Sequence, residues 1–110
     1  MTSHQETPMA RVLVLYATPP NPAAFDQHYA DIHIPLAKKL PGLQKFDIST
    51  GPINSPAGPS PFHAIATLTF ADMPTLLAAL SSPEGQAAAA DAQTLMASGS
   101  QLLFFDTHEA

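Results

Sequence analysis

The chain has 110 residues, a formal net charge of −5 and no cysteine. With only four basic residues it has no basic stripe to neutralise nucleic-acid phosphates or to bind anionic membranes. The absence of cysteine excludes disulfides and thiolate zinc sites.

The N-terminal part predicts a tail, a strand and the start of a helix. We expect residues 1–9 to form a flexible N-terminal tail and residues 10–110 to form a single domain. Ala10–Thr18 is rich in β-branched and apolar residues and is typical of a buried strand. Two prolines end this strand, and Asn21 is then expected to cap a helix whose first residue is Pro22.

The predicted helix runs to about Leu40, where a Pro-Gly pair ends it. The spacing predicts an apolar face made of Phe25, Tyr29, Ile32, Leu36 and Leu40. His33 lies among these residues, and a titratable ring on a buried face needs a partner or a use. Pro35 lacks an amide donor, so we expect a kink or a local break beside His33.

Two further strands follow, separated by a loop. Leu43–Ser49 alternates apolar and polar residues and predicts a half-buried strand. Residues 51–61 hold four prolines and two glycines, which indicates a loop that is either functional or a variable surface segment. Phe62–Phe70 alternates again and predicts the third strand.

The C-terminal part predicts two helices and a last strand. Asp72 is a capping residue for a helix over Pro74–Leu80. A second helix over Gln86–Met96 is rich in alanine, and we interpret it as architecture rather than as part of a site. Gln101–Thr107 predicts the fourth strand.

The order β-α-β-β-α-β is the ferredoxin-like pattern of the α+β class. It predicts a four-stranded antiparallel sheet with both helices on one face. The strands carry apolar residues enough for two faces, and only 12% of the chain is charged. We therefore expect a second copy to cover the open face as a homodimer.

The helix carries the spaced pattern F-x-x-x-Y-x-x-x-H-x-P-L-x-x-K-L-P-G-L. Its residues are Phe25, Tyr29, His33, Pro35, Leu36, Lys39, Leu40, Pro41, Gly42 and Leu43. This pattern resembles the EthD family, named for a protein associated with bacterial ether degradation. Ser82–Ala92, which reads SPEGQAAAADA, is similar to the second helix motif of that family.

The resemblance implies a dimeric α/β barrel, in which two ferredoxin-like subunits pack sheet against sheet. It also implies an apolar pocket between sheet and helices, with the histidine and tyrosine of the first helix near it. Relatives are linked to catabolic clusters and to the tailoring of aromatic polyketides. The wider superfamily includes cofactor-free monooxygenases, lactone isomerases and haem proteins.

Tyr29 and His33 are four residues apart and are expected to be neighbours on one helix face. Beside an apolar cavity, His33 would transfer a proton near neutral pH and Tyr29 would hydrogen-bond a developing enolate or phenolate oxygen. The alternative is a structural histidine bonded to a backbone carbonyl or to the other subunit.

The other histidines give weaker signals. His28 is expected at the helix edge, either paired with Asp31 or solvated, and not on the same face as His33. No spacing typical of a metal site is present, and we expect no metal. His63 begins the third strand and points either to the pocket or to the dimer face.

The sequence therefore predicts a small homodimeric protein of the EthD type without cofactor. We expect an acid/base enzyme of isomerase, dehydratase or decarboxylase type that acts on an apolar aromatic or polyketide-like molecule. The predicted site has His33 and Tyr29 as catalytic residues, and Phe25, Leu36, Phe62 and His63 as substrate-binding residues. The alternatives are a non-catalytic binding protein for an oxygenase system and a haem protein ligated by His33.

One further expectation concerns location. The apolar runs are much shorter than the about 20 residues that span a bilayer. No N-terminal segment joins a basic flank to an apolar core long enough for export. We expect a cytoplasmic protein.

Overall fold

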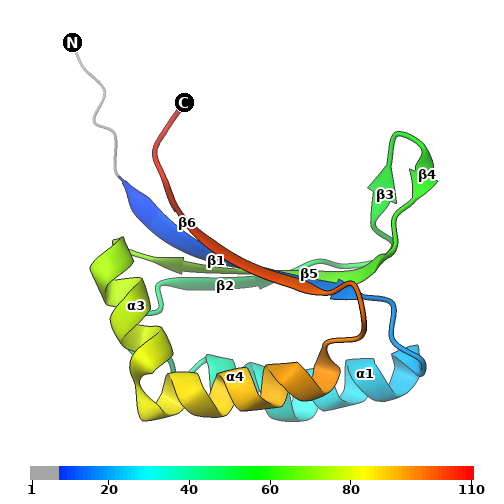
Figure 1. The fold of residues 1–110 in the computed structure, drawn as a ribbon, viewed down its shortest axis with the longest axis horizontal. Coiled ribbons are helices and arrows are strands. Elements are labelled where there is room, and N and C mark those ends of the chain that lie inside the picture. Colours follow the sequence, from blue (N-terminus) through cyan, green and yellow to red (C-terminus); the bar gives the residue numbers. More distant parts are fainter. Residues whose placement is uncertain (1–7) are drawn as a thin grey trace.

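The computed structural model describes residues 8–110 as a sheet with a layer of helices (Figure 1). Most of the predicted tail, residues 1–9, lies outside the described residues, although Met9 already belongs to the first strand. In chain order the elements are β1 (Met9–Ala17), α1 (Pro22–His28), η1 (Tyr29–His33), α2 (Ile34–Ala37), β2 (Lys45–Ile48), β3 (Asn54–Ser55), β4 (Gly58–Pro59), β5 (Phe62–Phe70), α3 (Met73–Ser81), α4 (Pro83–Leu95) and β6 (Gln101–Thr107). Within this part of the chain, no helix is long and apolar enough to cross a membrane.

The main sheet has four strands in the order β2-β5-β1-β6, and every neighbouring pair is antiparallel. The helices cover one face of this sheet, and the small β3–β4 hairpin rises on the other side (Figure 1). The predicted ferredoxin-like architecture is therefore confirmed. The predicted loop over residues 51–61 differs in one respect, because it contains this hairpin.

The core lies between the sheet and the helices. Residues of the two central strands that pair across the sheet point to the helices together, as Val12 and Leu68 do. These buried residues are Ala10, Val12, Val14, Tyr16, Ala64, Ala66, Leu68 and Phe70. The opposite face stays open: Leu103 and Phe105 of β6 are 46% and 37% exposed.

The first helix is interrupted at the place that Pro35 predicted, but by a π-helical turn. The Ile34 amide donates to the Tyr29 carbonyl, five residues back. A π turn inserts one extra residue, so the face of the helix shifts by one position. The buried positions are accordingly Phe25, Tyr29, His33, Ala37 and Leu40. The prediction that Ile32 is buried is wrong, since its side chain is 47% exposed.

The helices α3 and α4 are joined by a sharp turn at Ser82. Asp72 caps α3 by accepting from the Thr75 amide at 2.8 Å, as predicted. Ser82 caps α4 in the same way through the Gly85 amide at 3.0 Å. A side chain at Gly85 would collide with the Ala79 carbonyl oxygen, so this close helix-helix turn requires glycine.

Candidate functional site

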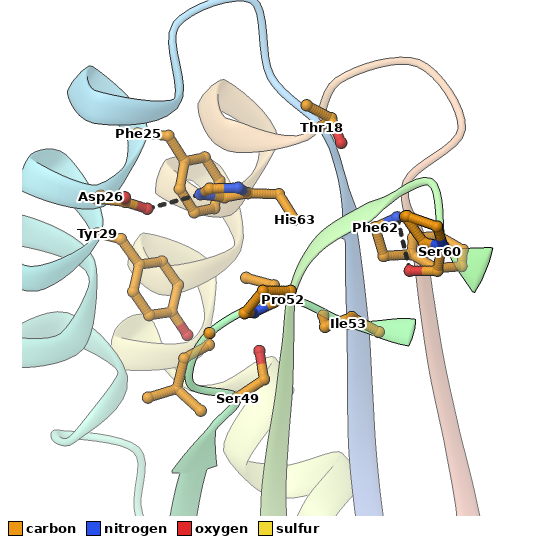
Figure 2. Close-up of a pocket in the computed structure, with 14 residues that line it drawn as sticks. Thr18, Phe25, Asp26, Tyr29, Ser49, Pro52, Ile53, Ser60, Phe62 and His63 are labelled. Atoms are coloured by element: carbon orange, nitrogen blue, oxygen red, sulfur yellow. Dashed lines mark hydrogen bonds and ion pairs between the residues drawn. The ribbon is translucent and has the colours of Figure 1, made fainter. Parts of the chain in front are cut away.

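A hollow with chemically active side chains lies between α1 and the ends of β1, β2 and β5 (Figure 2). Its volume is about 510 Å³, which is within the range of small-molecule sites. The residues that line it are Thr18, Phe25, Asp26, Tyr29, Ile48, Ser49, Gly51, Pro52, Ile53, Pro59, Ser60, Phe62, His63 and Ala64. We call it the outer pocket.

A histidine-carboxylate pair borders the outer pocket. His63 Nε2 lies 2.6 Å from Asp26 Oδ1, and the histidine ring meets the Phe25 ring edge-on at 5.0 Å between centroids. The His63 side chain is 23% exposed and that of Asp26 is 65% exposed. Because Nε2 is used by the carboxylate, His63 keeps Nδ1 for a bound molecule.

Tyr29 supplies a hydroxyl group to the same pocket. Its residue is 5% exposed, and the hydroxyl has no hydrogen-bond partner among the described residues. Figure 2 shows this hydroxyl turned away from α1, toward the side of the pocket where Ser49 lies. Burial, and to a lesser degree the neighbouring Tyr16, raise the pKa of Tyr29. The phenol is therefore a neutral hydrogen-bond donor over the whole physiological range.

Aromatic rings join the outer pocket to the interior. Phe25 stacks on Tyr29 with centroids 5.7 Å apart, and Tyr29 stacks on His33 at 5.2 Å. Tyr16 meets both Phe25 and Tyr29 edge-on, at 5.2 Å and 5.6 Å. His33 consequently lies behind Tyr29 and does not line the outer pocket.

A second histidine-carboxylate cluster lies at the inner end of these rings. His33 Nδ1 is 2.9 Å from Asp91 Oδ2, and His28 Nε2 is 2.8 Å from Asp91 Oδ1. Burial raises the pKa of Asp91, but the hydrogen bonds from His28 and His33 outweigh it, and the net effect lowers this pKa. The expectation that His28 pairs with Asp31 is wrong, since its partner is Asp91, but its side chain is 39% exposed, as expected for the edge of the helix.

The π turn explains this correction. In a regular α-helix, residues five apart point to different sides, which is why we expected His28 and His33 on separate faces. Across a π turn, residues five apart come round to nearly the same side. Both rings therefore reach one carboxylate. Even so, no cluster of three or more acidic, histidine or cysteine side chains within residues 8–110 is arranged to hold a metal ion.

His33 and Tyr16 also line a small apolar cavity of about 60 Å³ beneath the sheet. Its other residues include alanines of α4 and Leu102 of β6. The Tyr16 hydroxyl has no hydrogen-bond partner in the described part of the chain, and burial raises its pKa. The cavity is far smaller than a porphyrin, so the surroundings of His33 do not fit haem in this arrangement.

The structure brings together four of the six residues predicted for the site. Phe25, Tyr29, Phe62 and His63 line the outer pocket, and His63 points to the pocket rather than to the open face of the sheet. Leu36 lies elsewhere, in a surface depression beside Lys39 and Pro83.

The two carboxylates were not predicted as site residues. Asp26 is an exposed residue of α1 and lies 37 residues from His63, so no local pattern points to their partnership. Asp91 is the single charged residue within the predicted helix Gln86–Met96. A lone acid among alanines is a usable signal, because such a residue on a packed helix needs a partner.

Three comparisons with known proteins agree with this fold. A family model described as the EthD domain matches residues 18–99. An uncharacterised 11.0 kDa protein of the thcB-thcC intergenic region in Rhodococcus erythropolis is 39% identical over 99 residues, covering 89% of this chain and 94% of that protein. An EthD family protein of Bacillus halodurans has 30% identity, a TM-score of 0.79, and coverage of 93% of this chain and 99% of its own.

More distant structures share the fold alone. SnoaB of Streptomyces nogalater, described as a cofactor-independent oxygenase, has 16% identity and a TM-score of 0.61, with 94% of this chain and 96% of its own covered. Two further structures with the ferredoxin-like fold, at 10% and 20% identity, are described as dimeric.

Proposed function

The chain belongs to the EthD family, and on that premise we propose that it is a cofactor-independent acid/base enzyme. Its substrate is an apolar aromatic or polyketide-like compound that binds in the outer pocket. The reaction is an isomerisation, dehydration or decarboxylation. SnoaB, which has the same fold, is described as a cofactor-independent oxygenase, and this supports a search for catalysis by side chains alone.

One observation carries the proposal: an unpartnered Tyr29 hydroxyl and a carboxylate-bound His63 ring border the same pocket. Both side chains pack against Phe25, which keeps them on one wall. A binding pocket for apolar molecules needs neither a buried donor without a partner nor a paired base. An acid/base site needs both.

The chemistry follows from these groups. Asp26 holds His63 through Nε2, which leaves Nδ1 to accept a proton from a carbon beside a substrate carbonyl. The electron pair of the broken C–H bond moves to the carbonyl oxygen, and Tyr29 donates a hydrogen bond to that oxygen. Return of the proton from Nδ1 to a different atom completes an isomerisation.

His33 was predicted as the proton-transfer residue, and this role stays a prediction. In the structure its ring supports Tyr29 from behind, while Nδ1 is bound to Asp91. Our proposal therefore gives proton transfer at the outer pocket to His63.

We also propose that the protein acts as a homodimer. Leu13 and Leu15 of β1 are half-buried on the open face, and the neighbouring Leu103 and Phe105 are substantially exposed. A second copy would bury this apolar surface. The dimeric structures with the same fold support this arrangement.

Exchange of the acidic protons of 2-tetralone in D₂O, followed by NMR, tests the proposal without knowledge of the substrate. This ketone is apolar, aromatic and of a size that the pocket accommodates. We expect the protein to accelerate the exchange, and His63→Gln and Tyr29→Phe each to lose about 10²-fold of that acceleration. His108→Gln is the matched control, since its residue lies near the C-terminus.

The alternative, a non-catalytic binding protein, predicts a different result. The protein would then bind 1-naphthol, an apolar fluorescent probe, and would leave the exchange of 2-tetralone unchanged. Exchange that is equally fast with His63→Gln would contradict the assignment of His63.

A further inference from the structure

We propose that Asp91 is a positioning residue for the outer pocket. By binding His28 and His33 together, it holds the π turn Tyr29–His33 and thereby fixes where the Tyr29 hydroxyl points. The inference rests on the proposed function of Tyr29 as the hydrogen-bond donor to the substrate.

The Asp91 carboxylate bridges two histidine rings. Asp91 belongs to α4, whereas His28 ends α1 and His33 ends η1, so the carboxylate joins two helices far apart in sequence. Each carboxylate oxygen accepts from a different ring, at 2.8 Å and 2.9 Å. The Asp91 and His33 side chains are only 12% and 8% exposed. The hydrogen bond between His33 and Asp91 is therefore well enclosed and little weakened by water, whereas the His28 side chain is 39% exposed.

The turn between the two histidines is a π turn. A π turn is rare, and it is found disproportionately at functional sites. The bridge requires this turn, because His28 and His33 share a side of the helix only when one extra residue separates them. The bridge also supplies two hydrogen bonds that favour the π turn over a regular α-helix.

Tyr29 belongs to this turn and its ring stacks on the ring of His33. Tyr29 is the first residue of η1, and its ring lies 5.2 Å from the His33 ring at an interplanar angle of 29°. The hydroxyl has no hydrogen bond of its own, so packing alone sets its direction. A change at Asp91 reaches Tyr29 through the His33 ring and through the backbone of the turn.

Asp91→Asn removes the charge and one acceptor oxygen of the side chain but keeps its shape. An amide has one acceptor oxygen, so it accepts from one histidine ring and not from both. The variant keeps the size of the side chain, which favours a folded protein. Asp31→Asn is the matched control, because Asp31 lies in the same π turn and is exposed.

Two spectroscopic measurements test the bridge without any ligand. The chain has no tryptophan and two tyrosines, Tyr16 and Tyr29, so the tyrosine band of its near-ultraviolet circular dichroism reports on these two rings. We expect Asp91→Asn to change that spectrum and to shift the ¹⁵N resonances of His33 from the Nδ1–H tautomer, with Asp31→Asn unchanged. Spectra of Asp91→Asn that match the unsubstituted protein would overturn the inference.

A double-mutant cycle with 1-naphthol tests whether Asp91 acts through Tyr29. We expect Tyr29→Phe and Asp91→Asn each to weaken binding about fivefold, the size of one net hydrogen bond, and the double variant to weaken it no further. Losses that multiply in the double variant would show that Asp91 affects binding by another route, and they would overturn the inference. If Tyr29→Phe binds 1-naphthol as tightly as the unsubstituted protein, the proposed role of Tyr29 as hydrogen-bond donor is contradicted. The two spectroscopic measurements would then still test whether Asp91 holds the π turn.

Discussion

The molecule contains two histidine-carboxylate pairs at opposite ends of one row of aromatic rings. The outer pair, His63 and Asp26, has side chains 23% and 65% exposed, and the inner pair, His33 and Asp91, has side chains 8% and 12% exposed. The outer pair borders a pocket of about 510 Å³, whereas His33 of the inner pair lines a cavity of about 60 Å³ and Asp91, together with His28, lines an open hollow of about 600 Å³. We propose different tasks for the two pairs, because the side chains of the inner pair are much less exposed than the outer carboxylate.

The difference in exposure between the two carboxylates affects what each pair can do. A solvated carboxylate can orient a histidine through one ring nitrogen and leave the other ring nitrogen for a ligand. A buried carboxylate must have its acceptors satisfied, and Asp91 meets this demand with a second donor, His28. We therefore assign chemistry to the outer pair and positioning to the inner pair.

Removal of the two carboxylates should separate the pairs most strongly. We expect Asp91→Ala to lower the free energy of unfolding by about 2 kcal/mol, because the buried His33 ring loses its acceptor, while the His28 ring is exposed enough for water to replace the carboxylate. Asp26→Ala should lower it by less than about 1 kcal/mol, since that pair is largely exposed. Urea denaturation followed by circular dichroism measures both values, and equal losses would contradict the distinction.

Acid should act on the inner pair in a predictable direction. Because the pKa of Asp91 is lowered in the folded state, its carboxylate stabilises the protein fully above the unfolded Asp pKa of about 3.9. That contribution is lost as the pH falls through the lower folded pKa. We expect the melting temperature of Asp91→Asn to change less between pH 4.5 and pH 2.5 than that of the unsubstituted protein. The same steep decline in both proteins would place the acid sensitivity elsewhere.

Substitution of Tyr29, whose ring lies between the two pairs, should lower activity without lowering stability. Tyr29→Phe removes a buried hydroxyl without a partner, so we expect the free energy of unfolding to stay constant or to rise by about 1 kcal/mol. Exchange of 2-tetralone protons should fall in the same variant. Thermal denaturation and the exchange assay together check this opposition, which a purely structural Tyr29 would not produce.

The smallest expected effect lies on the outside of the π turn. Ile32 is exposed although the α-helical spacing predicts it in the core, so Ile32→Ser should change stability by less than about 0.5 kcal/mol. Ala37→Ser, at a position that the π turn buries, is the matched comparison and should cost more. A larger loss at Ile32 than at Ala37, by urea denaturation, would contradict the shifted helix face.

Much of the fold follows from local patterns. The alternation in Phe62–Phe70 gave that strand its observed bounds, and Asp72 capped α3 as expected. The Ser82 cap and the β3–β4 hairpin were missed, because neither belongs to a strong period. The π turn was missed for another reason: Pro35 indicates a break in the helix but does not say which hydrogen-bond spacing replaces it.

The sequence predicted individual residues of the site but not the pairs that they form. Phe25, Tyr29 and His63 were named, and they meet in the outer pocket. Their carboxylate partners were not, since Asp26 is 37 residues from His63 and Asp91 is 58 residues from His33. Neither distance along the chain has a period or a motif that would reveal it.

The sequence by itself determined the strands of the main sheet, the main helices, the ferredoxin-like order and the family, because caps, alternation and motif spacing act over a few residues. Only the tertiary structure decided which carboxylate each histidine binds, and that His33 lies behind Tyr29 while His63 borders the pocket. The physical reason is that burial and ring contacts depend on how α1, α4 and β5 pack together. Packing is a property of the whole chain, and it turned two similar pairs of residues into two different sites.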